Sequence, residues 1–193
     1  MSDLLFPCDG VILDACVIIN LYASGYMQSV LESIPKPTSI AAYVYEMEAQ
    51  RIYTGPDDDV AKETELINLR SLVDGKLLRV VPLEDGPEAA AAVSFSATTR
   101  LDTGEAISAA IAVHRSWSLA TDDKTAISFL MREMPQLHLV STPELLKHWV
   151  DAARPHFTVA SLALGNIRKR ARYEPHFDHP LYEWWKRCGE DAF

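Results

Sequence analysis

The sequence predicts an α/β protein: a three-layer α/β/α sandwich with a central, mostly parallel sheet, followed by a C-terminal helical and aromatic extension. Short apolar runs that indicate buried strands alternate with stretches of helical spacing between residues 11 and 153. Such alternation is typical of parallel strands covered by helices on both faces. The 193 residues, of which 48% are hydrophobic and 23% charged, suit one well-cored domain. We therefore expect that domain over residues 1–153 and the extension over residues 154–193.

The first elements form a strand, an acidic residue and a helix. Residues 11–13 are apolar and end at Asp14, after which residues 15–22 continue with apolar side chains at helical spacing. Gly25 ends or breaks this helix before residues 26–31 resume its apolar face. The order strand, acid, helix places Asp14 at the carboxyl end of the first strand.

Two further helices are predicted over the next forty residues. Thr38 or Ser39 can cap the first, because hydroxyl side chains accept from the free N–H groups of a helix start. The acidic triplet 57–59 can cap the second, over residues 60–73, and Gly75 is well placed just past its end.

The remaining main-domain elements continue the alternation of strands and helices. Three short apolar runs predict strands: residues 77–83, 117–120 and 137–140. Three stretches predict helices: residues 104–114, 125–134 and 142–153. Residues 84–101 are rich in alanine and predict either a helix or a partly mobile loop.

Four carboxylates stand out by their positions. Asp14 and Asp122 follow strands, Glu105 begins a helix, and Glu46 lies on a predicted helix where Glu48 is a competing candidate. Strand ends and the first turns of neighbouring helices meet at one edge of a parallel sheet, so these acids can share a pocket. Converging carboxylates need protons or cations, and hard oxygen ligands suit Mg²⁺ or Mn²⁺. Such ions can hold a phosphodiester and activate a water for attack on it.

Each of these acids also has a purely structural explanation. Asp14 can cap the helix after the first strand, as can one of Asp122 and its neighbour Asp123. Glu105 can complement a helix N-terminus, and Glu46 can be a solvated helix residue. The combination of acids in this order is more specific than any single member.

Four segments together resemble the PIN-domain ribonucleases, which include the toxins of VapBC toxin–antitoxin modules. They are Val11-Ile-Leu-Asp-Ala-Cys-Val-Ile-Ile-Asn20, Tyr45-Glu46, Gly104-Glu105-Ala106 and Leu119-Ala-Thr-Asp-Asp123. The resemblance implies a small acidic pocket that binds Mg²⁺ or Mn²⁺ and cleaves RNA, leaving a 5′ phosphate and a 3′ hydroxyl. It implies that the catalytic and metal-site residues are Asp14, Glu46, Glu105 and Asp122, with Asp123 as a fifth metal ligand. Family members often carry a small hydroxyl or amide residue where this chain has Cys16.

The resemblance also implies partners: an RNA substrate, an antitoxin protein if the chain is a toxin, and a second copy of the chain. The homodimer would form near the first two helices, whose apolar residues exceed what one sheet face needs. Those residues are Ile18, Ile19, Tyr22, Met27 and Leu31. The alternative to a nuclease is a non-catalytic PIN-like scaffold that binds RNA or a protein.

Charge is distributed unevenly along this chain, whose net charge is −9. Residues 1–150 carry eleven Lys and Arg against twenty-one Asp and Glu, whereas residues 151–193 carry seven against six. Four cations of the extension form a basic run that can bind substrate or can be a solvated helix face: Arg168, Lys169, Arg170 and Arg172. The aromatic residues after this run predict either rings packed onto the domain or a platform for bases.

Several other classes of protein are disfavoured. The sequence has no GxxxxGK[ST], GxGxxG or GxSxG motif, so a P-loop, a dinucleotide site and a serine hydrolase have no support. A haloacid-dehalogenase-like phosphatase would need an acid where Cys16 stands. Three cysteines without a CxxC pair support reduced thiols.

The sequence also predicts where the protein is found. No apolar run reaches the roughly 18–20 residues of a membrane span, and residues 1–10 do not have the order of a signal peptide. We therefore expect a cytoplasmic protein without membrane contact.

Overall fold

A five-stranded parallel sheet forms the centre of the computed structural model, which describes residues 5–49, 51–54, 63–97 and 100–190. Its strands are β1 (Val11–Leu13), β2 (Thr38–Ala41), β5 (Arg79–Val81), β6 (Ser118–Ala120) and β7 (Leu139–Val140). Their order across the sheet is β5-β2-β1-β6-β7, and every pairing is parallel. The predicted α/β class with a parallel sheet is therefore confirmed. Strand order reverses between β1 and β6, and ligands of such sheets gather beyond the carboxyl ends of the strands at this point.

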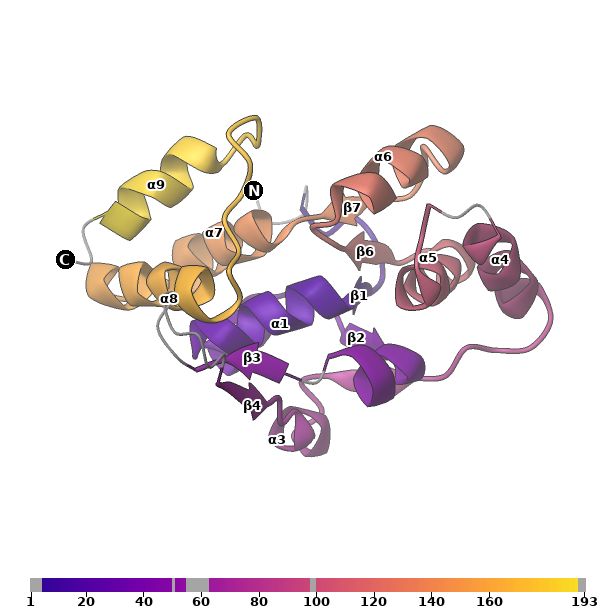
Figure 1. Ribbon diagram of the computed structural model, residues 1–193, viewed down its shortest axis with the longest axis horizontal. Coiled ribbons are helices and arrows are strands. Elements are labelled where there is room, and N and C mark those ends of the chain that lie inside the picture. The colour runs from indigo at the N-terminus through magenta and orange to yellow at the C-terminus, as the bar shows by residue number, and fades with distance from the viewer. Residues whose placement is uncertain (1–4, 50, 55–62, 98–99, 191–193) are drawn as a thin grey trace.

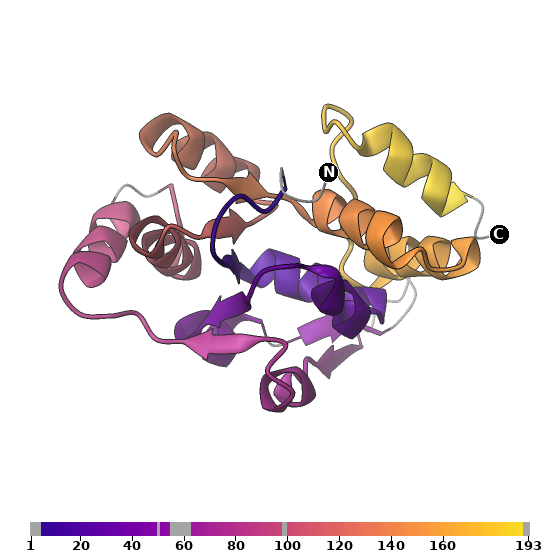
Figure 2. The same ribbon diagram turned by 180° about the vertical axis from the view of Figure 1, so that it is seen from behind.

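Helices cover both faces of the sheet. Figures 1 and 2 show α1, α7 and α8 grouped on one side of the strands and α4 and α5 on the other. The helices are α1 (Ala15–Ser24), α2 (Met27–Ser33), α3 (Arg70–Asp74), α4 (Pro87–Ser96), α5 (Thr103–Arg115), α6 (Lys124–Glu133), α7 (Thr142–Ala153), α8 (Phe157–Arg170) and α9 (Tyr182–Glu190). Within the described residues, none of them combines the length and the apolar character needed to cross a bilayer.

One predicted helix is a strand, and the helix predicted over residues 60–73 is confirmed only at its end, in α3 with Gly75 as its C-cap. Residues 38–41 form the strand β2, and the helical turn comes after it, as the π-helical η2 (Val44–Glu48). All four β2 residues are buried between β1 and β5, so the strand lacks the polar and apolar alternation that reveals a half-buried strand. Farther along, residues 64–66 form β4, which pairs antiparallel with β3 (Arg51–Tyr53) instead of extending a helix. The acidic triplet 57–59 lies outside the described residues.

Local signals predicted the other elements well. Helix α1 ends at Gly25, whose φ of 78° is a left-handed conformation that glycine adopts without strain. The alanine-rich stretch is helical over α4, with Pro87 in its first turn. Helix α7 starts with a capping box in which Ser141 and Glu144 each accept from the other's backbone N–H.

The C-terminal extension packs against the first helix. Helix α8 lies beside α1, and its Ala163, Leu164 and Ile167 join the same hydrophobic cluster as the strands. The ring of Tyr173 packs edge to face on that of Trp185 in α9, with ring centres 5.8 Å apart.

The packing of α8 and α7 covers apolar residues of α1 and α2 on which the homodimer prediction rests. Ile18, Met27 and Leu31 are at most 5% exposed, because α8 packs on α1 and α7 packs on α2 within the same chain. Three of the five apolar residues behind the homodimer prediction are thus buried within one chain, whereas Ile19 and Tyr22 are only partly buried. The homodimer itself stays a prediction.

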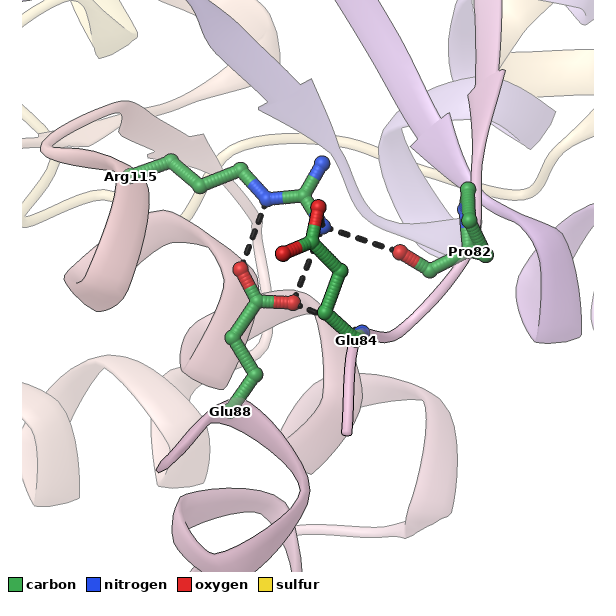
Figure 3. Close-up of polar contacts among 4 residues, drawn as sticks. All are labelled: Pro82, Glu84, Glu88 and Arg115. Atoms are coloured by element: carbon green, nitrogen blue, oxygen red, sulfur yellow. Dashed lines mark hydrogen bonds and ion pairs between the residues drawn. The ribbon is translucent and has the colours of Figure 1, made fainter. Parts of the chain in front are cut away.

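A buried ion pair joins α4 to α5 (Figure 3). The guanidinium of Arg115 donates from Nε and from a terminal amino group to the two carboxylate oxygens of Glu88, at 2.7 and 2.9 Å. It also donates to the carbonyl oxygen of Pro82 at 2.9 Å. Glu88 is only 6% exposed, and its hydrogen bonds with Arg115 hold the pKa of its carboxyl below the ordinary value. The pair therefore fixes the start of α4 against the end of α5.

Candidate functional site

The site is centred on Asp14, at the point where strand order reverses. β1 and β6 are in register with Leu13 opposite Ala120, and the Asp14 backbone N–H donates to the Ala120 carbonyl at 3.0 Å. Asp14 therefore lies beside Thr121 at the carboxyl edge of the sheet. Its side chain is 3% exposed and occupies the N-cap position of α1 without making a capping hydrogen bond.

One oxygen of the Asp14 carboxylate is held and the other is unsatisfied. Oδ2 accepts from the Thr121 hydroxyl at 3.1 Å and from the Cys16 thiol at 3.4 Å. Oδ1 is buried and has no hydrogen-bond partner among the described residues. Burial raises the pKa of Asp14, although the backbone N–H of Ala15 and the side chains of Cys16 and Thr121 act to lower it. A buried, unpaired carboxylate oxygen is costly, and a bound cation is one way to satisfy it.

Cys16 is a hydrogen-bonding member of this group. Its thiol donates to Asp14 and accepts from the backbone N–H of Asp122 at 3.3 Å. Burial, together with the charges of Asp14 and Asp122, raises the pKa of the thiol far above its ordinary value, so the proton stays on sulfur. Cys16 thus makes the contact that a small hydroxyl residue would make at this position.

On the turn after β2, the competing candidate Glu48 lies beside Gly104 and close enough to Asp14 for their charges to interact. Glu46 is exposed, whereas Glu48 is partly buried and accepts a hydrogen bond from the backbone N–H of Gly104. A Cβ atom at Gly104 would lie 1.9 Å from Glu48 Oε2, so this approach requires glycine. Burial raises the pKa of Glu48, and the charges of Asp102 and Asp14 add to the rise. The structure therefore favours the alternative, Glu48, over the predicted Glu46.

Glu105 and Asp102 form a capping box at the start of α5. The Asp102 backbone N–H donates to Glu105 Oε2 at 2.9 Å, and the Glu105 backbone N–H donates to Asp102 Oδ1 at 2.8 Å. Burial raises the pKa of Glu105 to about 7, with further contributions from the charges of Asp102, Asp14 and Asp123. Glu105 therefore lies near the other acids, as predicted. Sequence reasoning missed Asp102, although Asp-x-x-Glu is the recognisable spacing of a capping box.

Asp122 is already saturated with hydrogen bonds. Its carboxylate accepts from Asn20 Nδ2, the Thr142 backbone N–H and the Tyr173 hydroxyl, each at 2.9 Å, and from the Thr142 hydroxyl. These donors come from α1, the start of α7 and the extension. Burial raises its pKa even so. Asp122 thus joins three segments, and both of its oxygens are occupied.

Asp123 caps the next helix, which confirms that one acid of this pair serves as a cap. Its Oδ1 accepts from the backbone N–H of Ala126 at 2.7 Å at the start of α6. Its charge also helps to raise the pKa of Glu105. Asp123 therefore combines a capping role at α6 with an electrostatic effect on Glu105, whereas Asp122 joins α1, α7 and the extension.

The basic run of the extension makes contacts within the chain. Arg170 donates to the Ala23 carbonyl at 3.1 Å and pairs with Glu65 in β4. The guanidinium of Arg172 lies 4.0 Å from the centre of the Tyr53 ring. Arg168 and Lys169 are exposed. Two of the four predicted substrate-binding cations therefore help to hold the extension against β3 and β4, and an RNA-binding role for the run stays a prediction.

The donor set fits a hard cation. Among the described residues, no three acidic, His or Cys side chains are already gathered at coordinating distance. The acids instead lie close enough to raise one another's pKa values, and Asp14 offers a buried free oxygen. An all-oxygen set of this kind suits Mg²⁺ or Mn²⁺ and not zinc. Comparisons with family models, curated proteins and solved structures find no match to this chain.

The raised pKa of Glu105 predicts a pH-dependent gain in stability for Glu105→Gln. A carboxyl whose pKa is about 7 when folded and about 4.5 when unfolded adds stability below pH 4.5, and that stability is lost as the pH rises through 7. Gln keeps an acceptor for the capping box but carries no charge. Because Glu105 is only half-buried and solvent screens part of the repulsion, we expect Tm to rise by about 2–4 °C at pH 8.

The measurement is thermal unfolding followed by circular dichroism in EDTA at pH 8 and pH 4.5. The gain should be small at pH 4.5, and exposed Asp85→Asn should change Tm little at either pH. Asp14 and Asp122 titrate in both proteins, so the difference between wild type and variant isolates Glu105. An equal gain at both pH values would contradict the placement of Glu105 among the acids.

Proposed function

We propose that the chain is a Mg²⁺- or Mn²⁺-dependent endoribonuclease of the PIN type. The observation that carries this proposal is the buried, unpaired Oδ1 of Asp14, at the sheet position where ligands gather and with other acids close by. An acidic group of this kind is unfavourable in a protein without a bound cation, which supports a metal centre. The sequence resemblance supports RNA as the substrate.

Asp14, Glu48 and Asp123 are the residues that would hold the metal. When bound, the ion would polarise the phosphodiester and lower the pKa of the attacking water. Thr121 and Cys16 fix the Asp14 carboxylate by hydrogen bonds to its Oδ2.

Glu105 is placed to act as the general base. Its Oε2 accepts from the Asp102 backbone N–H, which leaves Oε1 to take a proton from water. A pKa near 7 suits proton transfer at neutral pH. Asp122 positions the elements around this group through its four hydrogen bonds and needs no direct contact with the metal.

The comparison of Glu48→Gln with Glu46→Gln tests the site. Both substitutions remove one carboxylate from the same turn, but Glu46 is exposed, whereas Glu48 is partly buried beside Gly104 and in the field of Asp14. We expect wild type and Glu46→Gln to cleave a 5′-labelled RNA in Mn²⁺ at rates within about threefold, leaving a 5′ phosphate. Glu48→Gln should be slower by more than about 100-fold, because changing residues that only contact metal ligands already costs about 10–100-fold.

The same experiments distinguish Glu46 from Glu48 as the metal-site residue, and the nuclease from the non-catalytic scaffold. A larger loss with Glu46→Gln would restore Glu46 as the metal-site residue, and equal rates for all three proteins would remove this turn from the site. If calorimetry detected no binding of Mn²⁺ while RNA or protein binding stayed intact, the non-catalytic scaffold would replace the nuclease. A toxin–antitoxin module, an antitoxin partner and a cytoplasmic location stay predictions of the sequence.

A further inference from the structure

A basic hollow lies at the start of α6. It has a volume of about 300 Å³ and is lined by Arg100, Lys124, Thr125, Ser128, Phe129 and Arg132. Three of these six residues are cations, and they come from two parts of the chain: α6 and the residues that precede α5. A second hollow of about 400 Å³ shares Arg100, Phe129 and Arg132 and is also lined by Glu133 and Met134. The first hollow, whose lining has three cations and no acid, suits an anionic ligand.

These cations are unusual in their setting. Residues 1–150 have only eleven Lys and Arg against twenty-one acids, and three of the eleven line this hollow. A cluster of like charges in one hollow creates a local positive potential that favours an anion.

The hollow also offers hydrogen-bond donors suited to phosphate. Lys124 and Thr125 belong to the first turn of α6, a ten-residue helix whose N-terminus favours negative charge. The hydroxyls of Thr125 and Ser128 add neutral donors. Arg132 donates from Nε to Glu133 at 2.7 Å, but both side chains are exposed. Such a surface pair contributes about 0–1 kcal/mol, so a phosphate can displace it.

The hollow adjoins the acidic site along the chain. Lys124 directly follows Asp123, and Arg100 lies two residues before Asp102. The charges of both aspartates act on Glu105. An RNA strand whose scissile phosphate lay at the acids would therefore have a neighbouring phosphate within reach of these cations.

We propose that this hollow binds a backbone phosphate of single-stranded RNA next to the scissile bond. The inference rests on the proposed function for its substrate class, and it assigns the positive binding surface to α6 instead of to the run at residues 168–172. The acidic domain then attracts RNA through a local patch beside the site, although its overall charge repels it.

Binding of a short fluorescein-labelled single-stranded RNA, measured by anisotropy in EDTA, tests the proposal without cleavage. The variant Lys124→Gln/Arg132→Gln is compared with Arg168→Gln/Lys169→Gln, which removes the same charge from exposed positions of α8. Each phosphate contact contributes about −0.7 to the log–log salt slope for single strands. We expect the α6 variant to bind about tenfold more weakly with a slope flatter by about 0.7, as the loss of one phosphate contact predicts, and the α8 variant to keep the wild-type slope.

Equal losses in the two variants, or a larger loss in the α8 variant, would overturn the proposal. Circular dichroism of both variants checks that they are folded. Cleavage by wild type together with unchanged RNA binding by the α6 variant would reject the hollow and leave the nuclease. Binding that depends on the hollow in a protein that never cleaves RNA would reject the nuclease and leave the hollow.

Discussion

Asp14→Asn is expected to abolish metal-dependent cleavage and at the same time to stabilise the metal-free protein. The carboxylate is buried with one oxygen unpaired, and burial raises its pKa, so its charge opposes folding at neutral pH. Asn removes that charge and keeps an oxygen for the hydroxyl of Thr121. We expect cleavage in Mn²⁺ to fall by more than about 100-fold and Tm in EDTA at pH 7 to rise by about 2–4 °C.

A metal centre at Asp14 requires both results in the same variant: the loss of cleavage and the rise in Tm. Labelled-RNA cleavage gives the first and thermal unfolding in EDTA gives the second, with exposed Asp85→Asn as the matched control for both. A variant that cleaves at the wild-type rate would remove Asp14 from the site. A variant that is inactive because it is less stable would indicate a structural role for Asp14 and would count against a metal centre.

Arg115→Met is expected to cause a large loss of stability. The substitution leaves the carboxylate of Glu88 buried at the start of α4 without its cation (Figure 3). Breaking a buried pair in this way typically costs about 3–5 kcal/mol, which corresponds to a fall in Tm of roughly 10 °C or more. Urea unfolding at pH 7 measures the change in the free energy of unfolding.

The pH dependence and a double variant identify the cause of this loss. Because Arg115 lowers the pKa of Glu88, the stability that the pair adds is present above pH 4.5 and is lost as the pH falls through the lowered pKa. The difference between wild type and Arg115→Met should therefore shrink in acid.

A double variant and a control test the same cause. Adding Glu88→Gln to Arg115→Met should recover most of the lost stability. The control is Glu84→Gln: the Glu84 side chain is 71% exposed, so this change should alter stability by less than about 1 kcal/mol. A loss that stays constant with pH would indicate a packing effect.

The strand–helix alternation could be predicted because most elements here have a local signal. Val11–Leu13 followed by Asp14, and Ser118–Ala120 followed by Thr121, are short apolar runs that stop at polar residues. The sequence 38–41 has no comparable signal, since hydroxyl residues before apolar ones fit both a helix cap and a buried strand. The pairing of these residues with β1 and β5 in the folded protein is what makes them a strand.

The acidic site was predictable in part for similar reasons. Asp14 and Glu105 follow from their places at a strand end and a helix start. The choice between Glu46 and Glu48 cannot be made from the sequence pattern. Because η2 is a π-helical turn, in which the Ala49 N–H bonds to the Val44 carbonyl, the 3.6-residue period does not show which of its side chains face the protein interior. The hydrogen bond between Tyr173 and Asp122 depends on how the extension folds back, which no local pattern encodes.

The contact from Tyr173 to Asp122 also sets the order in which the site can be assembled during translation. Domains fold from the N-terminus as they are synthesised, so Asp14 and the strands emerge long before residue 173. Until that residue leaves the ribosome, Asp122 lacks one of its donors and α1 lacks the cover of α8. A chain that ends before residue 173 would thus hold Asp122 with three of its four hydrogen bonds, those from Asn20 and Thr142.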